Sequence, residues 1–300
     1  MRRRSFLKLA ALTPVAAMGL EVLGGRPALA IAEDAAGGSE AAAFPVNAVG
    51  YTAYGTLTAD QLDQLTGRKA KVVRVYHKQG TPVPTTATDA RILIQLQAGR
   101  HVVLSLKVPD ATQTTFDACN ALGADIAKLG FASAVWIVLW HEPFPELTAS
   151  QYIARYRPLA PAIRRHGIAC GVAFQTYPIW HKNLDYTTYW PGNDLTDFLG
   201  IDTYPGDTTS GLAADPLATI APLTSFAKTN GKPFGIAEFA VSATDAAANP
   251  VGAKTWIERF EQMGTSCHFT SWFNALDLGL ENNNGLLVPA YRAVYDHFGG

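Results

Sequence analysis

The sequence predicts a single (β/α)8 TIM barrel, because short apolar runs recur along the chain at intervals that fit one strand plus one helix. Eight such runs lie between Phe44 and Phe273, and the ends of successive runs are 25 to 35 residues apart. Strands that are nearly continuous in apolar residues are typical of a parallel sheet covered by helices. Eight strand and helix units in about 255 residues match the barrel, whose chemistry takes place where strands pass into the following loops.

Each predicted strand is a short run rich in residues that favour β-structure. In chain order the runs are residues 44–51, 71–76, 101–106, 134–140, 169–174, 197–202, 233–239 and 269–273. Between the first two, Thr58 and Gln61 form a capping-box pattern that predicts a helix over residues 58–65. Another helix is expected over residues 150–166, ending at Gly167. A doubly wound open sheet is the competing architecture, but residues 44–55 lack the G-x-G-x-x-G loop that it would usually carry.

The first 30 residues resemble an export signal, with a basic cluster before an apolar segment too short for a convincing membrane span. The twin-arginine pattern R-R-x-F-L-K is matched by Arg3, Arg4, Phe6, Leu7 and Lys8. We expect cleavage after Ala30, although an uncleaved anchor is the alternative. Residues 31–43 read as a flexible lead-in, and residues 44–300 as the barrel domain. The expected mature protein is therefore secreted or periplasmic, and a monomer without stable membrane insertion.

Composition excludes several classes of function. The chain has 300 residues, of which 48% are hydrophobic and 16% charged, so it can bury a large core. Without residues 1–30 it has 19 basic and 24 acidic residues, a net charge of −5, and no basic run to bind nucleic acid. Cys119, Cys170 and Cys267 are too few and too scattered for a disulfide scaffold or a Cys-x-x-Cys metal site. No cofactor or metal is expected.

Two glutamates end apolar strands on facing sides of the predicted barrel. Glu142 follows the fourth strand in VWIVLWHE, and Glu238 ends the seventh in PFGIAEF. Cleavage of a glycosidic bond requires such a pair, in which one carboxylic acid protonates the departing oxygen while the other carboxylate attacks the anomeric carbon or activates water. A carboxylate at the edge of a hydrophobic wall also loses hydration, which raises its pKa and suits Glu142 to hold a proton.

These segments resemble glycoside hydrolase family 26, within the large clan of retaining (β/α)8-barrel glycosidases. His141-Glu142, the IAEF around Glu238 and the stretch TTYWPGNDLTDFLGIDTYPG are similar to that family's motifs. The resemblance implies that Glu142 is the acid/base, that Glu238 is the nucleophile, and that Tyr204 donates a hydrogen bond to Glu238. It implies a β-mannanase-like endo-β-glycanase. However, the chain continues after Glu142 with Pro-Phe-Pro-Glu, where family mannanases commonly have Met-Asn-Gly and a tryptophan, and this weakens the mannan assignment.

Six further residues are expected to contact a poly- or oligosaccharide substrate. His141 could orient the acid or bind a sugar hydroxyl, and Trp272 matches the aromatic floor that the eighth strand contributes in the clan. Trp180 could stack on a pyranose face. Asp202 need not point into the cleft and is interpreted as structural. The complete predicted set of binding residues is His77, His141, Tyr177, Trp180, Tyr204 and Trp272.

Other functions fit the sequence less well. Metal-dependent hydrolysis would usually show His-x-His, and serine hydrolysis would show G-x-S-x-G, but the chain has neither. A clan relative acting on β-glucan or β-xylan is the enzymatic alternative. The alternative from another class is a secreted carbohydrate-binding barrel without turnover, although such a protein would have no need of two carboxylates flanking one bond.

Overall fold

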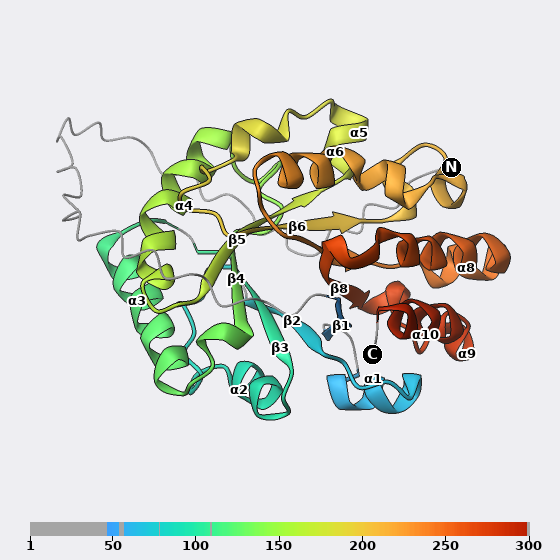
Figure 1. Cartoon of the computed structure of the whole chain (residues 1–300), viewed down its shortest axis with the longest axis horizontal. Helices are drawn as coiled ribbons and strands as arrows, with labels where there is room; N and C mark the ends of the chain where they lie inside the picture. The colour runs from blue at the N-terminus through green and yellow to red at the C-terminus, as the bar shows by residue number, and fades with distance from the viewer. Residues whose placement is uncertain (1–46, 54–56, 78, 109, 299–300) are drawn as a thin grey trace, which may run out of the picture. The chain divides into compact units, whose positions relative to one another are not determined.

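The computed structural model describes residues 47–53, 57–77, 79–108 and 110–298. The predicted export signal and the lead-in lie outside these residues. The eight strands form one closed barrel in chain order, and each pairs in parallel with its neighbours, so the fold prediction is confirmed (Figure 1). The strands are β1 Ala48–Ala53, β2 Val72–His77, β3 His101–Leu106, β4 Val135–Leu139, β5 Ala169–Gln175, β6 Phe198–Thr203, β7 Phe234–Phe239 and β8 Cys267–Asn274.

Helices surround the strands and bury their outward-facing apolar side chains (Figure 1). The predicted Thr58/Gln61 capping box starts α1, and a second box, of Thr148 and Gln151, starts α4. The helices are α1 Ala59–Thr66, α2 Ala90–Gln97, α3 Gln113–Lys128, α4 Ala149–Arg164, α5 Tyr177–Lys182, α6 Pro216–Thr229, α7 Ala243–Ala248, α8 Pro250–Glu258, α9 Asn282–Gly285 and α10 Val288–His297. Short 3₁₀ helices cover Ala132–Ala134, Tyr186–Tyr189, Pro205–Asp207, Gly211–Ala213, Arg259–Ser266 and Leu276–Leu278.

Aromatic side chains fill the interior of the barrel. Trp136 packs on Phe198 with ring centroids 4.3 Å apart, and Phe269 meets both rings edge-on. Glycines on neighbouring strands leave room for these rings: a Cβ atom at Gly171 would lie 2.4 Å from Phe198, and one at Gly235 would lie 2.3 Å from Phe269. The barrel interior around these rings is therefore a packed core, so a site can form only at the carboxyl ends of the strands.

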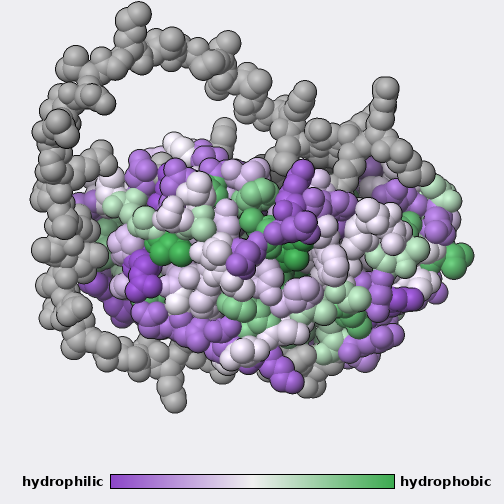
Figure 2. Space-filling model, turned by 90° about the horizontal axis from the view of Figure 1, so that it is seen from above, coloured by the Kyte–Doolittle hydropathy of each residue, from purple (hydrophilic) through white to green (hydrophobic). Residues whose placement is uncertain are grey.

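Large apolar side chains that are exposed to solvent are scattered over the surface. In the view of Figure 2, hydrophilic and hydrophobic residues alternate over the face that is shown. No helix in the described part of the chain has both the length and the apolar composition required to cross a bilayer. The large hydrophobic side chains with the greatest exposure are Ile94, Leu129, Trp180, Val251 and Leu286.

Candidate active site

Glu238 lies at the carboxyl end of β7, buried and surrounded by donors. The hydroxyl of Tyr204 donates to Oε2 at 2.5 Å, and the hydroxyl of Tyr76 donates to Oε1. Arg74 places Nη1 3.2 Å from the same Oε1. Two hydrogen bonds and a positive charge stabilise the carboxylate form of the side chain, which is the form a nucleophile requires.

Arg74 is fully buried beneath Glu238 and is held from two other strands. Its Nη1 donates to Oδ1 of Asp202 at 2.8 Å, and its Nε donates to Oγ of Ser105 at 3.0 Å. A register shift between β6 and β7 brings Asp202 opposite Glu238. Burial raises the pKa of Asp202 to about 8, with the nearby Glu238 charge adding to the effect and Arg74 opposing it. Asp202, interpreted from the sequence as structural, is thus part of the charged cluster.

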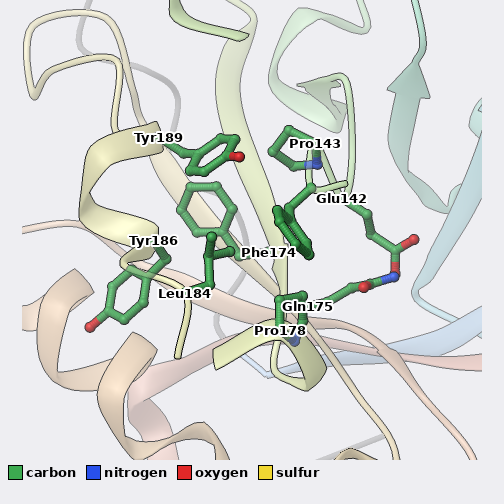
Figure 3. Close-up of a pocket in the computed structure, with 9 residues that line it drawn as sticks. Glu142, Pro143, Phe174, Gln175, Pro178, Leu184, Tyr186 and Tyr189 are labelled. Atoms are coloured by element: carbon green, nitrogen blue, oxygen red, sulfur yellow. The ribbon is translucent and has the colours of Figure 1, made fainter. Parts of the chain in front are cut away.

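Glu142 reaches the cluster through an unusual backbone at the end of β4. Trp140 and Glu142 have φ angles of 59° and 50°, a left-handed conformation that non-glycine residues rarely adopt and that is common at functional sites. The carboxyl group points away from the ring of Phe174 and toward the side-chain amide of Gln175, with which it forms a hydrogen bond (Figure 3). Burial, then the charges of Glu238 and Asp202, raise the pKa of Glu142 well above its ordinary value.

The two glutamates meet as the sequence predicts. One carboxylate oxygen from each of Glu142, Asp202 and Glu238 lies within 4.8 Å of the other two. Three carboxylates so arranged could bind a metal ion, but the guanidinium of Arg74 already supplies a cation between Asp202 and Glu238. The positive charge of Arg74 therefore offsets part of the negative charge that the three carboxyl groups can carry.

His141 precedes Glu142 in the chain, and its side chain is packed against Tyr76. Its ring meets the ring of Tyr76 edge-on, with centroids 4.8 Å apart. Burial lowers the pKa of His141 well below its ordinary value, and the positive charges of Arg74 and Lys107 add to the effect. The side chain is therefore a neutral imidazole, which can hydrogen-bond a sugar hydroxyl but carries no charge. Its predicted contact with the substrate stays a prediction.

The structure contradicts the predicted position of Trp272. This side chain is fully buried, donates its indole N–H to the carbonyl of Leu278 at 2.9 Å, and packs on Phe239 and on Tyr291 of α10. Because side chains alternate along a strand, Phe273 faces the site instead. Its ring lies 6.3 Å from that of Tyr76 and 6.4 Å from that of Tyr204. The expectation that Trp272 forms a sugar-stacking wall is therefore wrong.

His77 is displaced from the site for the same reason. Its Nε2 lies 2.5 Å from the carbonyl oxygen of Pro82 and 2.8 Å from Oγ1 of Thr81, within the loop that follows β2. Tyr76, one residue earlier, points into the barrel and reaches Glu238. The prediction that His77 contacts the substrate is wrong, and the strand contributes Tyr76 in its place.

The remaining two predicted binding residues lie on α5. Tyr177 begins this helix, and its ring stacks on that of His181 with centroids 4.6 Å apart. Trp180 is 47% exposed, and its indole N–H donates to the carbonyl of Thr219 in α6 at 2.9 Å. Trp180 thus presents a fixed ring to solvent, as a stacking platform would, and the roles of both residues stay predictions.

A small apolar pocket lies beside the acid, between the loops that follow β4 and β5 (Figure 3). The rings that line it approach the backbone of Glu142, whereas the carboxyl group of Glu142 lies on the other side. The lining residues are Glu142, Pro143, Phe144, Phe174, Gln175, Pro178, Leu184, Tyr186 and Tyr189.

Sequence reasoning gave no role to four residues of the site, Arg74, Tyr76, Gln175 and Phe273, although Tyr76 and Gln175 are among the strand-end residues that it expects to meet. Tyr76 and Gln175 lie at or next to the ends of predicted strands, where the functional residues of a barrel are expected. Side chains at every second position of a strand face the same side. Arg74 therefore shares a strand face with Val72, and Phe273 shares one with Phe269, so counting in steps of two from these core residues identifies both.

The sequence of the chain matches no protein-family profile and no curated protein. Its structure is similar to that of a glycoside hydrolase family 26 β-mannanase from Bacteroides ovatus, with a TM-score of 0.57, 16% identity, and coverage of 84% of this chain and 88% of that one. An endo-β-1,4-glucanase from Xanthomonas axonopodis pv. citri matches with a TM-score of 0.60, 15% identity, and coverage of 84% and 98%.

A Thermotoga maritima protein in complex with mannotriose has a TM-score of 0.55, 13% identity, and coverage of 82% of this chain and 97% of that one. The same protein is also known in complex with cellobiose. At these identities the likeness shows a shared fold. The resemblance to family 26 and its clan is thus confirmed at the level of the barrel.

Proposed function

We propose that this chain is a retaining β-glycoside hydrolase with Glu142 as the acid/base and Glu238 as the nucleophile. The observation that carries the proposal is that one oxygen of Glu142 lies within 4.8 Å of one oxygen of Glu238, where the pKa of Glu142 is raised and Glu238 receives two hydroxyl hydrogen bonds beside Arg74. Retaining enzymes hold this pair about 5 to 5.5 Å apart, whereas inverting enzymes leave about 6.5 to 9.5 Å for a water molecule.

The reaction would proceed in two displacements. Glu238 attacks the anomeric carbon while Glu142 gives its proton to the departing glycosidic oxygen, and a glycosyl-enzyme ester forms. Glu142, now ionised, then takes a proton from water, which attacks the same carbon and releases Glu238. Both steps invert the anomeric centre, so the product keeps the configuration of the substrate.

The proposed substrate is a β-linked polysaccharide, cleaved internally as in a β-1,4-mannanase. The structural likeness to a β-mannanase supports this choice, and the likeness to an endo-β-1,4-glucanase keeps β-glucan open. Release of reducing ends from β-mannan, mixed-linkage β-glucan, β-1,3-xylan and chitin distinguishes these substrates. Binding to one of them without any release would instead favour the non-catalytic carbohydrate-binding barrel.

The stereochemistry of the first product tests the mechanism. On the active wild type, NMR should detect the β-anomer first, before mutarotation. Glu238→Ala should abolish turnover, and azide should restore it in part by replacing the nucleophile, giving a glycosyl azide of inverted configuration. Glu142→Ala should spare the first step for substrates with good leaving groups, since these need no proton. An initial α-product would contradict the double displacement even if both glutamates were essential.

We also propose that the protein is exported through a twin-arginine signal, on the strength of Arg3, Arg4 and the Ala28-Leu29-Ala30 site. Replacing Arg3 and Arg4 by lysine keeps the positive charge but removes the recognised pair. The mature form should then disappear from the exported fraction of an exporting host and the full-length precursor should accumulate. Unchanged export of the double-lysine variant would contradict the proposal.

A further inference from the structure

Two tyrosines hold Glu238 from opposite sides of the barrel, one on each carboxylate oxygen. Tyr204, from the end of β6, donates to Oε2, and Tyr76, from β2, donates to Oε1. Both rings pack edge-on against the ring of Phe273. The guanidinium carbon of Arg74 also lies 4.7 Å from the centroid of the Tyr76 ring. Packing therefore fixes each hydroxyl independently of any substrate.

The two oxygens of Glu238 are not equivalent. Oε1 receives the Tyr76 hydroxyl and has Nη1 of Arg74 3.2 Å away, whereas among the described residues the Tyr204 hydroxyl is the donor to Oε2. A hydrogen bond and a positive charge withdraw electron density from the oxygen they contact, which makes it a poorer nucleophile. Oε2 is therefore the more reactive of the two.

We propose that Oε2 attacks the anomeric carbon and that Tyr76 is a positioning residue that stays on Oε1 throughout the reaction. This proposal rests on the retaining mechanism proposed above. As Oε2 bonds to the anomeric carbon, the bond from that carbon to the leaving oxygen breaks with its electron pair, and Glu142 supplies the proton to that oxygen. The Tyr204 hydroxyl leaves Oε2, while Oε1 becomes the carbonyl oxygen of the ester and keeps Tyr76 and Arg74.

The hydroxyl of Tyr76 should affect hydrolysis of the glycosyl-enzyme, the second step, more than its formation. Glu142 takes a proton from water, the water oxygen bonds to the anomeric carbon, and the electron pair of the carbon–Oε2 bond returns to Glu238. The donors on Oε1 stabilise this returning negative charge, as an oxyanion hole does. Loss of the Tyr76 hydroxyl should therefore slow release of the sugar more than formation of the glycosyl-enzyme.

The test uses Tyr76→Phe with 2,4-dinitrophenyl β-cellobioside and β-mannobioside, whose first step needs no proton. We expect kcat and KM to fall together by about tenfold to a hundredfold, the loss of one hydrogen bond to a charged group. A burst of dinitrophenolate equal to the enzyme concentration should precede the steady state. Tyr204→Phe should show no such burst. Tyr156→Phe, which removes a buried hydroxyl on α4 that donates to Leu195, is the matched control and should behave as the wild type.

The proposal is overturned if kcat/KM of Tyr76→Phe falls and no burst occurs, because the role of Tyr76 is then merely structural. It is also overturned if Tyr204→Phe shows the burst and Tyr76→Phe does not. If Tyr76→Phe does not fold, a crystal structure of the wild type trapped with a 2-deoxy-2-fluoro β-glycoside decides. The Tyr76 hydroxyl on the ester carbonyl supports the proposal, and the Tyr204 hydroxyl there overturns it. An inactive wild type would instead refute the proposed function, and this proposal with it.

Discussion

Glu142 and Glu238 carry the same functional group, and their different neighbours support the different roles that we propose for them. Glu142 is buried and lies close to two other carboxyl groups, and both effects raise its pKa against the opposing hydrogen bond from Gln175. Glu238 receives two hydroxyl groups and lies beside Arg74, so its negative charge is stabilised. Two carboxyl groups with opposed surroundings are how an enzyme keeps a general acid and a nucleophile in one site.

Neighbouring residues on β8 should separate stability from activity. Trp272→Ala empties a fully buried site and should lower the free energy of unfolding by about 3 to 5 kcal/mol. Phe273→Ala removes the support of Tyr76 and Tyr204 and should lower kcat/KM by about tenfold to a hundredfold, with a smaller loss of stability. Chemical denaturation and steady-state kinetics check both. A specific kinetic defect in Trp272→Ala with unchanged stability would restore the predicted stacking wall.

At the scale of elements, the strands and helices follow from local sequence and the details of the site do not. Apolar runs and the Thr58/Gln61 box predict the barrel and its first helix because both are local signals. Which residue of a strand end faces inward depends on the register, so the sequence favours His77 at a strand end where the structure brings Tyr76 to Glu238. The left-handed backbone conformation at Trp140 could not be predicted from the sequence, because no glycine marks it.

At the scale of the whole molecule, the site joins parts of the chain that are far apart in sequence. Arg74 and Asp202 are separated by 128 residues, and Tyr76 and Glu238 by 162. Only closure of the barrel brings these strands together, so no local pattern could reveal their pairing. The cluster gathers three carboxyl groups around the guanidinium of Arg74, and this crowding should be visible in the pH dependence of the stability of the folded protein.

The raised pKa of Glu142 predicts how stability depends on pH. The folded state raises the pKa of Glu142 above its unfolded value of about 4.3, so the native protein binds more protons than the unfolded chain above that pH. The free energy of unfolding must then fall as pH rises from about 4 toward neutrality, insofar as Glu142 determines it. Glu142→Gln removes this group, so its stability relative to the wild type should increase with pH across that range.

Urea denaturation of the wild type and of Glu142→Gln from pH 4 to pH 8 measures the difference, in which the contributions of titrating groups outside the cluster of Glu142, Asp202 and Glu238 largely cancel. At neutral pH the variant should be inactive on polysaccharide yet more stable, because the site sacrifices stability to hold an acid beside two other carboxylates. Glu258→Gln, which changes a carboxyl on α8 that pairs only with Lys254 among the described ion pairs, is the control and should run parallel to the wild type. Parallel curves for Glu142→Gln would show that Glu142 has the same affinity for its proton in both states, and would remove the physical basis for its role as the acid.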